Sequence, residues 1–488
     1  MNRLRKILSW FFVCSYAILC PMLIVYALGY VKGGLIILDV TPPEAEVEIA
    51  GQTLTGPWPK TISRLPTENL QAHVQAPGHG EMTREVSVTR GEATVLDHLL
   101  LLPDPLVPRV VIPDTTFSHL QALDGTSHLL LTKTKGPTLL AFDWKKGEAV
   151  PVLPSDSELN AAPVKHIDTV DGSESAVVWF RHKKHGGAVV DLSHTPAVVR
   201  VVPELAGKNP PKILWGGINP EAFFLVEKGY VRRAFKKNKG AAVEEVEDGS
   251  QLIGSSTWRG FGMGDSELYG LDASWQLRRM DRFGTPLNTD EPEPRAEEVE
   301  KARLLFGEKE FFSIIPINDE AFFFLGENGT LLQNQLPHQL VGENVKIRGA
   351  KLAPNSGRAL IWQPNKAGII NEPIPRRHRG GQLQPGRVVR WFYEKGSNIR
   401  AAYFVHDGSH ALLLDGDRVL LVELFPGVIA AKREITKVKS GSSIAYSEES
   451  GTLFFLDAKR GQLNALRLLP ETKVKTPAAK ISVIKPAP

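Results

Sequence analysis

The sequence predicts an all-β protein with one N-terminal transmembrane helix, in which a small β-sandwich is followed by a seven- or eight-bladed β-propeller. Three observations support this fold class. An uncharged apolar run opens the chain, and short segments of alternating apolar and polar residues follow over residues 34–102. Strand–turn–strand units then recur over residues 105–470.

The apolar run is long enough to span a bilayer. No charged residue interrupts residues 7–28, and about 20 helical residues cross the hydrocarbon layer. We expect residues 7–30 to form an uncleaved signal-anchor helix in contact with the lipid bilayer, and a cleaved secretory signal is the alternative. The residues assigned to the anchor are Arg3, Arg5, Lys6, Pro21, Tyr26 and Tyr30.

The charges around this run predict the orientation of the chain. Residues 1–6 form a basic stub, and the positive-inside rule places such a stub in the cytoplasm. The C-terminal domains are therefore expected outside the cytoplasm, as parts of a single-pass protein of the cell membrane. The tail over residues 471–488 is rich in Lys, Pro and Ala, which predicts disorder.

Cysteine content and charge exclude some functions. Both cysteines, Cys14 and Cys20, lie in the apolar run, so the predicted exported part has no disulfide and no cysteine-ligated centre. The net charge is +4 and the cations are dispersed, which argues against nucleic acid as a partner.

Residues 34–102 indicate a small antiparallel sandwich. The predicted strands cover residues 35–40, 45–49, 70–75, 84–89 and 93–102. Apolar positions alternate after a proline, and glycines follow at the expected turns. The residues that carry this pattern are Pro42, Ala45, Val47, Ile49, Gly51, Pro59 and Gly78.

This pattern resembles the PEGA domain, a small β-sandwich of bacterial envelope proteins, although Glu44 stands where the family signature has glycine. The resemblance implies a surface or adhesion-type module with no catalytic residues. An apolar N-terminal run joined to such a domain also resembles a group of single-pass bacterial membrane proteins in which a β-propeller-like region follows.

The large C-terminal region contains eight predicted hairpins. They lie at residues 127–143, 175–191, 222–235, 268–279, 321–332, 358–370, 410–423 and 452–466. Their spacing is typical of four-stranded propeller blades, which repeat every 40–50 residues or so. Two packed sandwiches are the alternative.

No catalytic motif is present, and we expect no catalytic residue, no cofactor and no metal. The best metal candidate is the pair His182 and His185, which flanks two lysines whose charge disfavours a cation. The pair His406 and His410 is interpreted as part of a turn.

Three aspartates recur at strand ends and could be mistaken for a carboxylate site. They are Asp143, Asp272 and Asp457. Because they occupy matching positions in the repeat, we interpret them as turn-forming residues.

A basic insert over residues 375–390 offers a possible binding surface on one rim of the propeller, and an ordinary solvated loop is the alternative. Its cations are Arg376, Arg377, Arg379, Arg387 and Arg390.

The leading hypothesis for function is a non-enzymatic, membrane-anchored envelope protein that binds or scaffolds protein or cell-wall glycan partners. One alternative is a hydrolase or lyase that acts on polysaccharide or peptide at the propeller axis. The other is a docking subunit of an envelope assembly or transport complex.

Overall fold

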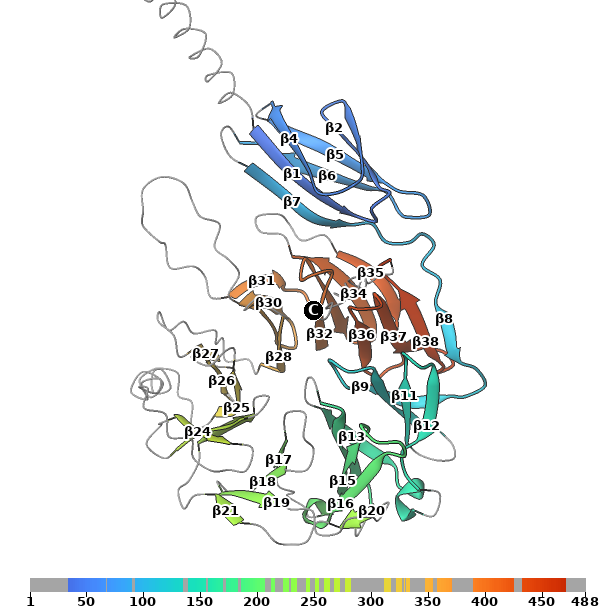
Figure 1. Cartoon of the computed structure of the whole chain (residues 1–488), viewed down its shortest axis with the longest axis vertical. Helices are drawn as coiled ribbons and strands as arrows, with labels where there is room; N and C mark the ends of the chain where they lie inside the picture. The colour runs from blue at the N-terminus through green and yellow to red at the C-terminus, as the bar shows by residue number, and fades with distance from the viewer. Residues whose placement is uncertain are drawn as a thin grey trace, which may run out of the picture. The chain divides into compact units, whose positions relative to one another are not determined.

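The computed structural model describes most of residues 34–470, with gaps in loops, of which 282–310, 334–346 and 371–388 are the longest. The chain divides into two compact units (Figure 1). Unit 1 comprises Met1–Val107, Glu448–Thr452 and Arg467–Pro488, and unit 2 comprises Pro108–Ser447 and Leu453–Leu466.

Unit 1 is built from two sheets. One has the strand order β4-β1-β7 and the other the order β3-β2-β5-β6. The strands are β1 (Gly34–Thr41), β2 (Glu46–Ile49), β3 (Gln52–Thr55), β4 (Lys60–Leu65), β5 (Asn69–Gln75), β6 (Met82–Ser87) and β7 (Ala93–Leu100). Alternate residues of β1, β2 and β5 are buried, as expected for strands with one face on a core.

The sequence pattern misses two strands of this unit, β3 and β4. The residues of β3 are polar and largely exposed, so no hydrophobic alternation marks them. The strand β4 follows closely on Pro57 and Pro59, which the sequence pattern indicates as a turn. The strand β3 forms by pairing with β2, and β4 forms by pairing with β1. Neither pairing produces a recognisable pattern in the local sequence.

The predicted fold class requires a correction in its helical part. The transmembrane helix predicted over residues 7–30 lies outside the described residues, together with all six residues assigned to the anchor. Within the described part of the chain, none of the helical segments has the length and hydropathy that crossing a bilayer requires. Those segments are two four-residue 3₁₀ helices, η1 (Glu158–Ala161) and η2 (Pro203–Ala206). The described fold is therefore all-β.

Unit 2 is a succession of antiparallel meanders. The first sheets contain β9 (Phe117–Ala122), β10 (His128–Lys133), β11 (Leu139–Asp143) and β12 (Glu148–Pro151), then β13 (Val164–Thr169), β14 (Ser175–Phe180), β15 (Gly187–Asp191) and β16 (Val198–Val202) with β20 (Val243–Glu245). The third contains β17 (Lys212–Trp215), β18 (Phe223–Glu227), β19 (Tyr230–Ala234) and β21 (Gln251–Ile253).

The next sheet joins two three-stranded meanders, β22 (Gly260–Met263), β23 (Glu267–Leu271) and β24 (Leu277–Asp281), and β25 (Phe311–Pro316), β26 (Phe322–Gly326) and β27 (Leu331–Gln333). The following sheets contain β28 (Gly349–Leu352), β29 (Ala359–Trp362), β30 (Ala367–Ile370) and β31 (Val389–Tyr393), then β32 (Ile399–Val405), β33 (His410–Asp415), β34 (Arg418–Glu423) and β35 (Lys432–Lys437). The last contains β36 (Ile444–Ser447), β37 (Thr452–Leu456) and β38 (Leu463–Arg467), together with β8 (Arg109–Ile112).

Each of the eight hairpins expected from the sequence is a pair of neighbouring strands in these sheets. The central strands are buried on both faces, as β10 and β33 illustrate, and this burial explains their aliphatic runs. Successive sheets pack face to face: Leu129 and Leu131 of β10 contact the last sheet, whereas Leu130 contacts the sheet that contains β14. Packing on both neighbours is the arrangement of propeller blades.

Two features join sheets that would otherwise end separately. The strand β8 pairs with β38, so the start of unit 2 completes its last sheet (Figure 1). The strands β22 and β25 lie parallel. They approach so closely that a Cβ atom on Gly262 would lie 1.9 Å from the backbone oxygen of Ile314. Glycine is therefore required at position 262.

Candidate functional site

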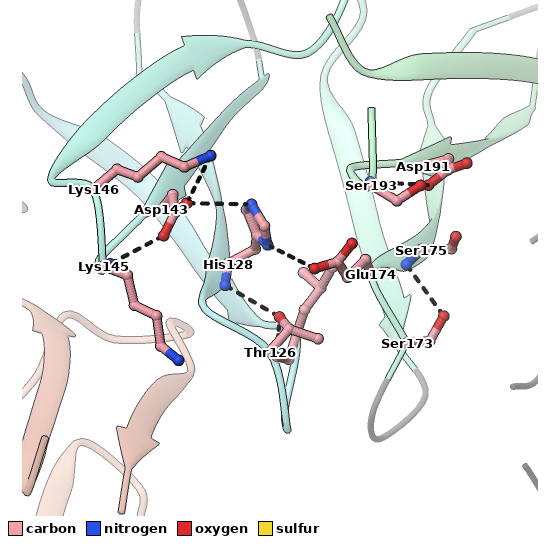
Figure 2. Close-up of polar contacts among 11 residues, drawn as sticks. Thr126, His128, Asp143, Lys145, Lys146, Ser173, Glu174, Ser175, Asp191 and Ser193 are labelled. Atoms are coloured by element: carbon pink, nitrogen blue, oxygen red, sulfur yellow. Dashed lines mark hydrogen bonds and ion pairs between the residues drawn. The ribbon is translucent and has the colours of Figure 1, made fainter. Parts of the chain in front are cut away.

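A polar cluster lies at one edge of the first two sheets of unit 2, and we call it the His128 cluster (Figure 2). In an antiparallel meander, the turns after the first and third strands lie at the same edge. The cluster occupies those turns of β9–β12 and β13–β16. Its members are Thr126, His128, Asp143, Lys145, Lys146, Ser173, Glu174, Ser175, Asp191 and Ser193.

His128 lies at the centre of this cluster, between two carboxylates that come from different sheets (Figure 2). It is paired with Asp143 in the β10–β11 register, and its Nε2 is 3.9 Å from Asp143 Oδ2. Its Nδ1 is 3.9 Å from Oε1 of Glu174, which immediately precedes β14. The imidazole side chain is 15% exposed, so a charge on it would act on both carboxylates.

The Thr126 hydroxyl helps to order the turn before His128. Thr126 Oγ1 donates to the backbone oxygen of Leu123 at 2.7 Å and accepts from the backbone N–H of His128 at 3.1 Å. In the second sheet, Ser173 Oγ similarly accepts from the backbone N–H of Ser175 at 3.2 Å. These bonds fix the turns without using the carboxylates of the cluster.

Asp143 combines a structural contact with a perturbed pKa. Its Oδ1 accepts from the backbone N–H of Lys145 at 3.0 Å, and Lys146 Nζ lies 3.5 Å from its Oδ2. Burial raises the pKa of Asp143, but the Ser127 hydroxyl, the Lys145 N–H and the charge of His128 outweigh that effect and lower it overall. Asp143 therefore remains a carboxylate at neutral pH.

Asp191 holds the matching position in the second sheet, at the end of β15. Its buried Oδ1 accepts from the backbone N–H of Ser193 at 3.0 Å and from Ser193 Oγ at 2.6 Å. Its Oδ2 is 3.7 Å from Nε2 of the exposed His194. Asp143 and Asp191 thus order the turns after the third strands in the same way.

The aspartates that the sequence pattern indicates as turn formers lie in separate sheets. Asp457 accepts from the backbone N–H groups of Lys459 at 3.0 Å and Arg460 at 2.6 Å, as a turn-forming residue does. Asp272 instead pairs with Arg278, whose Nε lies 3.0 Å from its Oδ2. The three aspartates do not converge on one site.

A second polar contact lies among the first strands of the sheets. Lys351 Nζ is 2.7 Å from Oδ2 of Asp124 and 4.3 Å from the ring centroid of Tyr403. The Tyr403 hydroxyl donates to the backbone oxygen of Ile444 at 2.9 Å. These contacts join the sheets of β28, β32, β36 and β9, so the polar groups here are occupied in holding sheets together.

The predicted basic rim lies almost entirely outside the described residues. Among its arginines, the structure describes Arg390, which belongs to β31 and is half-buried. Its Nη2 donates to the backbone oxygen of Leu424 at 2.8 Å. The described arginine of the rim therefore bridges neighbouring sheets.

The two histidine pairs considered as metal candidates differ in how far the structure describes them. His185 lies outside the described residues. The Nδ1 atoms of His406 and His410 lie 3.0 Å and 2.8 Å from Ser409 Oγ. Over the residues that the structure describes, no group of three or more His, Cys, Asp or Glu side chains is arranged to hold a metal ion.

The PEGA-like residues occupy the core and turns of unit 1. The side chains of Ala45, Val47 and Ile49 are buried. Gly51 has φ of +72° in a two-residue turn between β2 and β3, where only glycine-like backbone conformations close the hairpin. Together these residues have structural roles in the sandwich.

Sequence reasoning missed His128 and Glu174. Both are polar residues at the start of aliphatic runs, and this position is the sequence feature that could have identified them as candidate site residues. Their proximity depends on how two neighbouring sheets pack, and one sequence does not contain that information.

Comparison with known proteins supports the assignment of unit 1. Residues 34–100 match the PEGA domain, which confirms the predicted resemblance. No curated protein matches the chain.

Among solved structures, the chain is similar to the Dos1 propeller, with 11% identity and a TM-score of 0.42 over 74% of this chain and 98% of that chain. It is also similar to the β-propeller domain of Cps50 (Swd1) from Myceliophteria thermophila, with 9% identity and a TM-score of 0.38 over 74% of this chain and 100% of that chain. A third is PorZ of Porphyromonas gingivalis, a surface component of the type-IX secretion system, with 12% identity and a TM-score of 0.35 over 72% of this chain and 42% of that chain. At these scores, the propeller assignment depends on the sheet order of unit 2.

Proposed function

We propose that this chain is a non-enzymatic binding or scaffold protein, and that unit 2 contacts a protein or glycan partner through the His128 cluster. The observation that carries the proposal is the gathering of carboxylates, ammonium groups and hydroxyls at one edge of two adjacent sheets (Figure 2). Loops at the edge of a rigid scaffold are where binding residues concentrate.

The exposure of the cluster supports a binding role. The side chains of Lys146 and Glu174 are 66% and 45% exposed, so a partner can reach a cation and a carboxylate. The turns that carry them are held by Asp143 and Ser173, respectively. A partner would therefore meet a preorganised surface, and the entropy lost on binding would be small.

The polar character of the edge also limits the kind of partner. Interfaces of non-obligate complexes have polar rims with hydrogen bonds and charges of both signs. Hydroxyls and carboxylates equally suit the hydroxyl groups of a glycan. Both partner classes therefore fit, and digestion with a protease or a wall hydrolase distinguishes them.

We infer further that both units act outside the cytoplasm, in a bacterial envelope. The support for this location is the resemblance of residues 34–102 to a module of envelope proteins. Protease added to intact cells should cleave the protein. Cleavage that occurs only after lysis would contradict this location.

The binding proposal is tested by capture of partners from solubilised envelopes on the purified full chain. The test variant is Lys146→Ala with Glu174→Ala, which removes one charge of each sign from the cluster. The control is Glu394→Ala with Lys395→Ala, which removes the same charges after β31, at the opposite edge of its sheet. Both variants should retain the thermal midpoint of the wild type.

We expect the control to capture the same partner as the wild type and the test variant to lose most of it. Digestion with a protease or a wall hydrolase before capture then identifies the partner as protein or glycan. Equal capture by the two variants, or capture of nothing by the wild type, would overturn the proposal.

A further inference from the structure

A group of cations lies at the edge opposite the His128 cluster, where the first strands of the sheets begin. Arg348 precedes β28, Arg400 is the second residue of β32, and Lys439 precedes β36. His119 lies near the start of β9. The strands β28 and β32, and likewise β36 and β9, are in contact, so four neighbouring sheets contribute to one location.

The hydrogen-bond acceptors of these cations are neutral. Arg400 Nε and Nη2 donate to the backbone oxygen of Gly416 at 3.1 Å and 2.7 Å. Lys439 Nζ donates to the backbone oxygen of Phe117 at 2.6 Å. A carbonyl oxygen satisfies an N–H donor but does not neutralise the charge, so the positive potential remains.

Arg348 is held in the same way. Its Nη1 donates to the side-chain oxygen of Asn398 and, at 3.3 Å, to the backbone oxygen of Ile399. A guanidinium carries more N–H donors than these contacts use, and the same applies to Arg400. Both arginines can therefore donate to a ligand without releasing their present partners.

Contacts connect these four residues one to the next. Ile399, which binds Arg348, is the chain neighbour of Arg400. Burial and the charge of Arg400 lower the pKa of His119, and a hydrogen bond with the backbone of Gly441 opposes them. Gly441 in turn follows Lys439 by two positions. His119 is thus a neutral neighbour of Arg400, and Gly441 connects it to the segment that carries Lys439.

Two carboxylates lie beside this cluster. Asp417 is one of them, and its charge raises the pKa of Arg400 against the effect of burial. Asp417 is exposed and offsets only part of three positive charges. The other carboxylate, Asp415, accepts from the backbone N–H of Asn398, but Arg418 Nη2 lies 3.4 Å from its Oδ2 and offsets its charge. Arg348 is exposed, while Arg400 and Lys439 are half-buried, so solvent and solutes reach the cations. The cluster therefore combines net charge, spare donors and access.

We propose that Arg348, Arg400 and Lys439 form a binding site for a phosphoryl group. A phosphoryl dianion matches the excess charge better than a single carboxylate does, and planar guanidinium groups bind phosphate oxygens in pairs. The site is small and local, and the chain has a net charge of only +4, which does not suit a nucleic acid. A soluble phosphate compound and a phospholipid headgroup share this chemistry.

The test is calorimetric titration of the full chain with inorganic phosphate at low ionic strength. We expect saturable binding that weakens as salt is added, because exposed charges are screened. The variant Arg348→Gln should weaken binding by about tenfold or more, since it removes a charge-assisted contact. The control Arg109→Gln removes an exposed cation from β8, the outermost strand of the last sheet, and should bind phosphate as the wild type does.

A second arm distinguishes the two sources of phosphate. Vesicles of phosphatidylcholine with phosphatidylglycerol are sedimented with the protein, with and without free phosphate. Vesicle binding that free phosphate displaces assigns a lipid headgroup, and phosphate binding without vesicle binding assigns a soluble ligand. If Arg348→Gln unfolds, Lys439→Gln replaces it. Absence of saturable binding in both arms, or equal binding by the wild type and the variant, would overturn the proposal.

Discussion

Lys351 and Asp124 form an ion pair of 2.7 Å that joins the first strand of one sheet to the turn after the first strand of another. Both side chains are 19% exposed, so solvent only partly screens the attraction. The ammonium group also lies over the Tyr403 ring. This contact connects sheets that are far apart in the sequence.

Removal of this ion pair should destabilise unit 2. We expect Lys351→Met to lower the free energy of unfolding by about 2 kcal/mol, between the values typical of exposed and buried pairs. Denaturation in urea measures the change. The double variant with Asp124→Asn should recover part of the loss, because no unpaired carboxylate remains, and a single variant as stable as the wild type would refute the role of the pair.

The stability of unit 2 should decline in acid partly through Asp415. This buried carboxylate accepts from Ser397 N at 2.8 Å, Asn398 N at 2.7 Å and Tyr393 Oη at 2.9 Å. Burial raises the pKa of Asp415, but these donors outweigh it, and the net pKa is lowered.

Because the pKa of Asp415 is lower in the folded state, its ionised form stabilises the fold. This contribution is complete at a pH above the unfolded-state aspartate pKa of about 4, and it is lost as the pH falls through the folded-state pKa. Asp415→Asn should cost about 2 kcal/mol at pH 7, because several donors lose their acceptor. The same variant should flatten the acid side of the stability curve. An unchanged pH dependence in this variant would contradict the assignment.

Tyr393 should remain a hydrogen-bond donor far into the alkaline range. Burial and the hydrogen bond to Asp415 raise the pKa of Tyr393 to about 12. Ultraviolet titration of the full chain should therefore show a late-ionising phenol that is absent in Tyr393→Phe. Loss of an early-ionising phenol in that variant would show that the contact with Asp415 does not form.

The turn between β2 and β3 should be improved by a single substitution. Ala50 has φ of +50° in this turn, a conformation that costs an L-residue about 1 kcal/mol and that Asn adopts more readily. Ala50→Asn should raise the thermal midpoint of unit 1. Gly51→Ala, at φ of +72°, is the opposite control and should lower it. A midpoint that both substitutions lower would refute this turn geometry.

The sequence predicts the central hairpins of the sheets because their strands are buried on both faces, as in β10 and β33, and leave aliphatic runs. It does not predict the outer strands, such as β12, whose residues are all exposed and show no periodicity. The pairing of β8 with β38 joins distant segments and has no local signal.

The candidate sites were harder to predict than the strands. The contact of His128 with Glu174 forms only when two sheets pack in one register. The cation group around Arg400 forms only when four sheets bring their first strands together. The basic insert gave a clear sequence signal, yet Arg390 is engaged with the backbone of Leu424. A run of charged residues shows only the local composition of the sequence. The clusters around His128 and Arg400 depend on which sheets the topology brings together.

Site-specific photo-crosslinking in living cells tests the proposed binding edge most directly. A photoreactive residue replaces Glu174 in the His128 cluster, and the control replaces Glu394 after β31. We expect a discrete crosslinked partner from position 174 and none from position 394. Equal crosslinking at the two positions, or none at position 174, would contradict it.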